Sequence, residues 1–123
     1  MEVNFNGQIQ NIESIERLGL ALDEFHKCEQ FELVCSASAG PSLFMLRNRD
    51  LAWLMYLRHE GDSGYHSQGD LTQNASATFQ LSNGQRDEYP ISWCIEVEQC
   101  YKAVAYFFVN GGQRPGWVQW SES

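Results

Sequence analysis

The sequence has few positive charges. Its 123 residues contain 8 Lys and Arg against 16 Asp and Glu, which gives a formal net charge of −8 at pH 7. Proteins that bind nucleic acids need a surplus of Lys and Arg on one face to contact phosphates, so the composition argues against an autonomous nucleic-acid-binding role. An acidic chain is suited instead to a basic protein partner, because opposite net charges accelerate encounter.

Long apolar runs are missing. The longest candidate, residues 103–109, is far shorter than the ~20 residues that a membrane-spanning helix needs. The first six residues, MEVNFN, lack both the basic and the apolar region of a secretory signal peptide. We therefore expect a cytoplasmic protein with no membrane partner.

Closely spaced cysteine pairs are missing as well. The four cysteines form no C-x-x-C pair, and zinc sites usually draw their ligands from such pairs. In the cytosol, free cysteines are usually reduced and behave as small buried hydrophobic residues. We therefore expect no metal, no disulfide and no cofactor at these cysteines: Cys28, Cys35, Cys94 and Cys100.

The residues that are present suffice for a single domain over residues 1–123. Hydrophobic residues make up 43% of the chain, and a chain of this length buries roughly two-thirds of its unfolded surface. Apolar residues recur at helical spacing from Ile15 through Leu18 and Leu22, and Ser14 is placed to cap the helix. This pattern predicts an amphipathic helix of about three turns.

Strand patterns follow this helix. The run at 51–58 is apolar on both faces, with Trp53 and Met55 on one face and Leu54 and Tyr56 on the other. A strand with this pattern is central and covered on both sides, and we expect helices to cover it. The predicted strands occupy residues 31–35, 42–47, 51–58, 77–81, 89–95 and 117–120.

Turn residues separate these strands. Ala39-Gly40-Pro41 ends one strand, and Asn83-Gly84 predicts a tight β-hairpin. Residues 1–10 fit either a short strand or coil, and residues 61–74 form a polar loop.

A second amphipathic helix is predicted near the C-terminus. Val97, Cys100, Val104 and Phe107 step by three and four residues, and Asn110-Gly111-Gly112 ends the pattern. The sequence therefore predicts an α+β fold, an antiparallel sheet with an N-terminal and a C-terminal helix packed on it and a short final strand.

Two polar strings resemble sites of catalysis or metal binding. Gly61-Asp62-Ser63-Gly64 contains the tetrapeptide around the nucleophile of trypsin-like proteases, but those proteases are about twice as long and place their histidine in a distinctive upstream motif. A metal cluster of His59, Asp62, His66 and Asp70 lacks the helical spacing that would fix its geometry. We expect ordinary loop residues at both places and a protein that is not an enzyme.

Two stretches carry a family resemblance. Residues 107–120, FFVNGGQRPGWVQW, end a helix in aromatic residues and continue with Gly, Arg-Pro and a final Trp. Residues 53–57, WLMYL, lead into residues 60–67, EGDSGYHS. Both stretches are similar to immunity protein family one of bacterial polymorphic-toxin systems, and the resemblance covers most of residues 50–120.

The resemblance implies a non-enzymatic antidote made in the cytosol of a toxin-producing bacterium. Such proteins bind the toxic C-terminal domain of a secreted or contact-delivered effector, and many of these toxins are nucleases or deaminases. No catalytic residue is carried over. Gly112, Pro115 and Trp120 match the family signature, and we expect them to support the fold. Trp120 is predicted to pack on the sheet as a latch, while Trp117 is either a second latch or an exposed anchor.

The toxin-binding surface is predicted from polarity and loop position. The candidates are Glu60, Asp62, Tyr65, His66, Asp70, Arg86, Asp87 and Glu88. A second hypothesis is a small hydrolase or ligand-binding domain whose site is assembled across the sheet. A deep polar pocket with perturbed pKa values would favour the hydrolase, and a flat or convex acidic face would favour the antidote.

Overall fold

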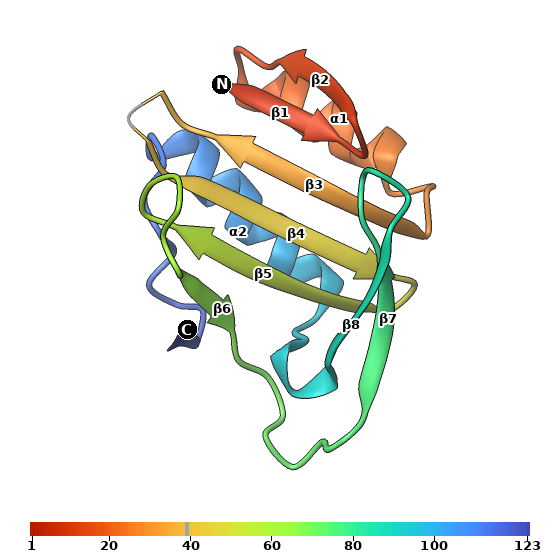
Figure 1. Cartoon of the computed structure of the whole chain (residues 1–123). Coiled ribbons are helices and arrows are strands. Elements are labelled where there is room, and N and C mark those ends of the chain that lie inside the picture. The colour runs from red at the N-terminus through yellow and green to blue at the C-terminus, as the bar shows by residue number, and fades with distance from the viewer. Residues whose placement is uncertain (39) are drawn as a thin grey trace.

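The structure is a computed structural model that describes residues 1–38 and 40–123. These residues form an antiparallel seven-stranded sheet of order β2-β1-β3-β4-β5-β6-β9, with the helices on one face and a separate hairpin, β7–β8, on the other (Figure 1). The α+β prediction is confirmed. The elements are β1 (Glu2–Phe5), β2 (Gln8–Asn11), α1 (Ile15–Phe25), β3 (Gln30–Ser36), β4 (Ser42–Asn48), β5 (Leu51–Leu57), β6 (Tyr65–Ser67), β7 (Ser76–Gln80), β8 (Arg86–Pro90), the 3₁₀ turn η1 (Ile91–Trp93), α2 (Val97–Val109) and β9 (Trp120–Glu122).

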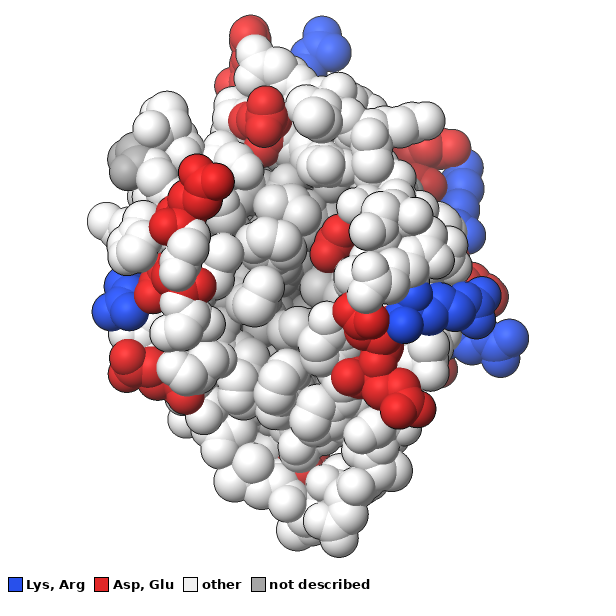
Figure 2. Space-filling view, viewed as in Figure 1, with Lys and Arg blue, Asp and Glu red and all other residues white. Residues whose placement is uncertain are grey.

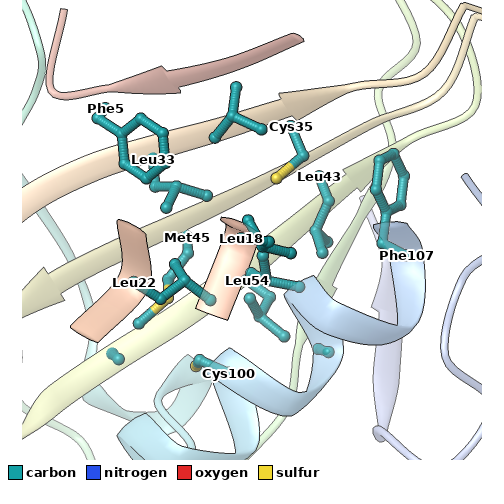
Figure 3. Packing of buried hydrophobic residues seen from close by; sticks show 14 of the residues in the cluster. Phe5, Leu18, Leu22, Leu33, Cys35, Leu43, Met45, Leu54, Cys100 and Phe107 are labelled. Atoms are coloured by element: carbon teal, nitrogen blue, oxygen red, sulfur yellow. The ribbon is translucent and has the colours of Figure 1, made fainter. Parts of the chain in front are cut away.

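The helices cover what we call the back face of the sheet. The Ser14 hydroxyl accepts a hydrogen bond from the backbone N–H of Arg17 at 3.2 Å, which caps α1 as predicted. The inward-facing residues of both helices and of the strands form one apolar cluster, and Figure 3 shows these side chains converging between helices and sheet. The helical members of the cluster that are buried are Leu18, Leu22, Cys100, Ala103, Val104 and Phe107.

The β7–β8 hairpin covers part of the opposite face, which we call the front face. Phe79 of β7 is fully buried against Leu46 of β4 and Trp53 of β5. The side-chain amide of Asn48 also donates to the carbonyl of Thr78 at 2.7 Å, which ties β7 to the end of β4. The expectation that helices cover both faces of β5 is therefore wrong for the front face, where a hairpin supplies the apolar cover.

Three short strands lie in segments where the sequence predicted a loop or left strand and coil open. β6 lies inside the predicted loop 61–74 and pairs with both β5 and β9. The N-terminal residues form the β1–β2 hairpin, which turns at Asn6 and Gly7, both with positive φ. A strand of three residues carries too little alternation to be recognised from its sequence.

The predicted strand boundaries need two corrections. The strand predicted at 89–95 ends at Pro90, because residues 91–93 turn and Cys94 donates its N–H to the carbonyl of Ile91 at 2.9 Å. The final strand occupies residues 120–122 and not 117–120. The polar residues 48–50 between two predicted strands form the turn of the antiparallel β4–β5 hairpin, in which Asn48 pairs with Leu51. Of the turn predicted at 39–41, Ala39 lies outside the described residues.

Candidate functional site

The strand register places a line of side chains across the front face. Residues that pair directly in antiparallel strands point to the same face of the sheet, so the pairings connect one residue from each of six neighbouring strands. All six are partly exposed. The line consists of Asn4, Val34, Phe44, Met55, His66 and Ser121.

Figure 2 shows the front face hollowed at its centre. The hollow is lined by residues other than Lys, Arg, Asp and Glu, and Asp and Glu flank it on both sides. Most Lys and Arg lie toward the outline of the view, but on the right a cationic side chain borders the acidic margin. This face therefore combines an uncharged floor with acidic margins.

Aromatic rings form one end of this face. Tyr89 of β8 packs on Trp53 with ring centroids 4.6 Å apart, and Trp93 of η1 lies 5.2 Å from Trp53. His66 stacks on Trp93 at 4.0 Å and an interplanar angle of 20°. We call Trp53, Tyr89, Trp93 and His66 the aromatic cluster. Trp53 is 2% exposed, and none of the described residues accepts a hydrogen bond from its indole N–H.

Two carboxylates lie beside the aromatic cluster. Asp87 accepts from the side-chain amide of Gln85 at 2.9 Å and from the Tyr89 hydroxyl at 3.3 Å. Glu32 of β3 accepts from the backbone N–H of Ser82 in the hairpin at 3.2 Å. Burial, together with the negative charges of Asp87 and Glu32, raises the pKa of Tyr89. Within residues 1–38 and 40–123, neither carboxylate forms a salt bridge.

The structure distributes the toxin-binding candidates over several surfaces. His66 and Asp87 face the front hollow, because His66 pairs with Met55 and Asp87 pairs with the buried Phe79. Arg86 and Glu88 alternate with Asp87 along β8 and therefore lie on the outer side of the hairpin. Both are exposed, as is Glu60 in the turn after β5.

Asp62 is hydrogen-bonded within the turn that follows β5. Its carboxylate accepts hydrogen bonds from the backbone N–H and the guanidinium of Arg58 at 2.8–2.9 Å, and its side chain is 4% exposed. These bonds hold the pKa of Asp62 well below its usual range. Gly64 follows with φ +75°, and a Cβ there would lie 2.6 Å from the Tyr56 carbonyl oxygen. The protease-like string is thus a tight turn between β5 and β6.

Tyr65 and Asp70 also lie away from the front hollow. Tyr65 pairs with Tyr56 on the back face, and the guanidinium of Arg114 lies 4.0 Å from its ring centroid. Asp70 accepts from the backbone N–H and hydroxyl of Thr72, which lowers its pKa. It lines a shallow cavity of about 530 Å³ together with Asp50 and Glu96. Across the described residues, no three His, Cys, Asp or Glu side chains are grouped to hold a metal ion.

The C-terminal motif residues pack at the end of α2. Gly112 has φ +99°, and a Cβ there would lie 2.8 Å from the Cβ of Ala37. Its carbonyl accepts from the Tyr56 hydroxyl at 2.8 Å. The indole N–H of Trp120 donates to the carbonyl of Pro115 at 2.9 Å, and its ring lies 6.3 Å from that of Tyr56. Trp117 differs from Trp120 in being 46% exposed.

The cysteine thiols are possible nucleophiles under the hydrolase hypothesis. All four are free. Burial raises the pKa of Cys35 to about 12 and that of Cys94 to about 11. A thiol must ionise to act as a nucleophile, and these two remain protonated near neutral pH.

Sequence reasoning missed several residues of the front face. Glu32, Phe44 and Met55 come from three different strands, and only their register brings them together. A partial signal was available, because Glu32 alternates with the apolar Phe31 and Leu33 and must point away from the helix-covered core.

The sequence of this chain matches a known protein family. Residues 18–122 match the family described as Immunity protein Imm1. The chain therefore belongs to this family of immunity proteins, as the resemblance implied. A comparison with curated protein sequences finds no match. Neither helix of the described residues has the length and apolar character needed to cross a membrane.

Proposed function

We propose that this immunity protein binds the C-terminal toxin domain of a cognate polymorphic or contact-delivered effector in the bacterial cytoplasm and occludes its active site without catalysis. Membership of the immunity family supports the antidote role. The observation that carries the mechanism is the front face, where an uncharged hollow lies between acidic margins (Figure 2).

The charge of the protein supports a basic target. A nuclease or deaminase that acts on nucleic acid needs a basic substrate cleft, and a chain of net charge −8 is complementary to such a cleft. We therefore propose that the acidic margins of the front face take the place of substrate phosphates in the cleft of the toxin.

We propose that the front face supplies the interface of the complex. A stable protein interface buries about 800 Å² on each partner, which corresponds to roughly 20–30 residues. The line across the sheet, the aromatic cluster and the margins together extend from β1 to β9. We propose that Glu60, His66, Arg86, Asp87 and Glu88 take part in binding. Asp62, Tyr65 and Asp70 are assigned to the support of the surrounding loops and the C-terminus.

Neutralisation tests this function. Cells that express the toxin domain encoded beside this gene should survive when the immunity protein is co-expressed. Calorimetry with a catalytically inactive toxin domain should give a one-to-one complex with a dissociation constant of about 1 nM or lower. Failure to protect cells, together with no measurable binding to the folded toxin domain, contradicts the proposal.

Salt dependence tests the electrostatic part of the mechanism separately. Raising the ionic strength from about 0.01 M to 1 M shortens the Debye length from ~30 Å to ~3 Å. The association rate should fall steeply over this range, while the dissociation rate changes less. An association rate that is independent of salt would contradict the mimicry of phosphates but not the binding itself.

A further inference from the structure

Two carboxylates lie beside the aromatic cluster on the front face, and among the described residues no Lys or Arg forms a salt bridge with either of them. Glu32 and Asp87 come from the sheet and from the hairpin, and both lie near Tyr89. The salt bridges among the described residues join Lys27 to Glu24, Arg49 to Glu29 and Arg58 to Asp62, all elsewhere in the fold. Each front carboxylate is held by neutral donors, so its negative charge is positioned without being neutralised.

Aromatic rings lie beside these carboxylates. Tyr89 and Trp93 are partly exposed and rest on the buried Trp53. Trp53 keeps an indole N–H with no acceptor among the described residues. Buried unpaired donors are rare in protein cores and call for an explanation. The partly exposed rings of Tyr89 and Trp93 therefore offer aromatic surface near the two carboxylates.

We propose that an arginine side chain of the cognate toxin domain inserts into the front hollow, between Glu32 and Asp87 and against the ring of Tyr89. This inference rests on the proposed function and names the anchor of the same surface. Guanidinium groups form planar, paired hydrogen bonds with carboxylates and stack on aromatic rings, whereas an ammonium group does not stack in this way. The hollow offers both kinds of contact within one site.

Charge complementarity favours the toxin domain, and not a second copy of this chain, as the partner of the front face. In a symmetric dimer through the front face, Glu32 and Asp87 of one copy would meet the acidic margins of the other. The chain has a net charge of −8, and like charges brought together at an interface are unfavourable. A basic toxin surface supplies the missing cation and removes this repulsion.

Isosteric variants test the anchor with little change of shape. Glu32→Gln keeps an oxygen to accept from the backbone N–H of Ser82. Asp87→Asn keeps only one of the two oxygens that accept from Gln85 and Tyr89, so thermal stability is measured alongside affinity. The double variant should bind the inactive toxin domain about 30-fold or more weakly than the parent. The control combines Glu16→Gln with Asp23→Asn, two exposed carboxylates on α1 behind the sheet. It removes the same number of charges and should leave the affinity unchanged.

A double-mutant cycle identifies the arginine on the toxin. Each surface arginine of the toxin domain is replaced by glutamine and titrated against the parent and against Asp87→Asn. One arginine should lose affinity strongly with the parent and only weakly with Asp87→Asn, because the two changes remove the same contact. Replacing that arginine by lysine should restore only part of the affinity.

The outcomes separate the inference from the proposed function. A parent protein that binds the toxin tightly, with the double variant binding equally well at matched thermal stability, overturns the arginine anchor and leaves the antidote role in place. A cycle in which no arginine is coupled to Asp87 also overturns the anchor. A parent that neither binds nor protects overturns both. A dimer of this chain that the double variant disrupts, with toxin affinity unchanged, assigns the hollow to self-association and overturns the anchor.

Discussion

The two faces of the sheet differ in what covers them and in how much of each is buried. On the back face, α1 and α2 seal an apolar cluster in which Leu33, Leu43 and Leu54 are fully buried (Figure 3). On the front face, the small β7–β8 hairpin buries Phe79 and Trp53 but leaves the line through Phe44 partly exposed. The side chains on the back face therefore mainly stabilise the fold. Those on the front face include partly exposed aromatic rings and carboxylates that form no salt bridge among the described residues.

This difference separates the scaffold from the surface available for binding. Changing the back face removes dispersion contacts and creates cavities, since its residues are closely packed. Changing the front hollow alters side chains that already contact solvent. We therefore expect substitutions on the back face to change the stability of the fold more than substitutions in the front hollow do.

The largest loss of stability is expected from a substitution on the back face. Leu54→Ala removes a fully buried side chain and should lower the free energy of unfolding by about 2–5 kcal/mol. That is a large share of the ~5–15 kcal/mol typical of a domain. Urea denaturation of the free protein measures the loss. A loss below about 1 kcal/mol would show that the back face is not the main source of stability.

A smaller loss is expected at the C-terminal latch. Trp120→Ala removes the contact with Tyr56 and the hydrogen bond to Pro115, and should cost about 2–3 kcal/mol without toxin present. Trp117→Ala is the matched control, since Trp117 is 46% exposed, and should change stability by about 0.5 kcal/mol or less. If Trp120→Ala melts like the parent but loses toxin binding, Trp120 belongs to the interface.

The turn between β5 and β6 should respond to pH. The pKa of Asp62 lies below its ordinary value of 3.8 in the folded protein, so its ionised form stabilises the fold at neutral pH. That contribution is lost as the pH falls through about 4 toward the lower folded pKa. Asp62→Asn should therefore melt below the parent at pH 7, and the difference should shrink in acid.

Thermal denaturation between about pH 7 and pH 2.5 measures this effect. Glu60→Gln, a neighbouring exposed carboxylate, serves as the control and should follow the parent across the range. A difference between Asp62→Asn and the parent that stays constant with pH would show that the Arg58 contacts do not favour the charged carboxylate.

A much smaller loss of stability than at Leu54 is expected at the next residue in the chain, Met55. Met55 points to the front face and is partly exposed, so Met55→Ala should cost only about 1 kcal/mol. It should nevertheless weaken toxin binding, because Met55 lies in the line across the hollow. Stability and affinity measured on Met55→Ala and Leu54→Ala together test the division between the faces. Equal losses of stability would contradict it.

The sequence alone determined the two helices, the β7–β8 hairpin and the family. Helical spacing predicted α1 and α2, Asn83-Gly84 predicted the β7–β8 hairpin, and the C-terminal motif pointed to the immunity family. These features depend on backbone preferences of neighbouring residues, which a sequence displays directly. The α+β class followed from the order of the elements.

Only the tertiary structure decided which residues share a surface. Tyr65 and His66 are adjacent in the sequence, yet they lie on opposite faces because successive strand residues alternate. Glu32 and Asp87 are far apart in the sequence, and both lie near Tyr89 because the hairpin folds onto β3 and β4. Such contacts depend on how distant elements pack, and local patterns do not encode that packing.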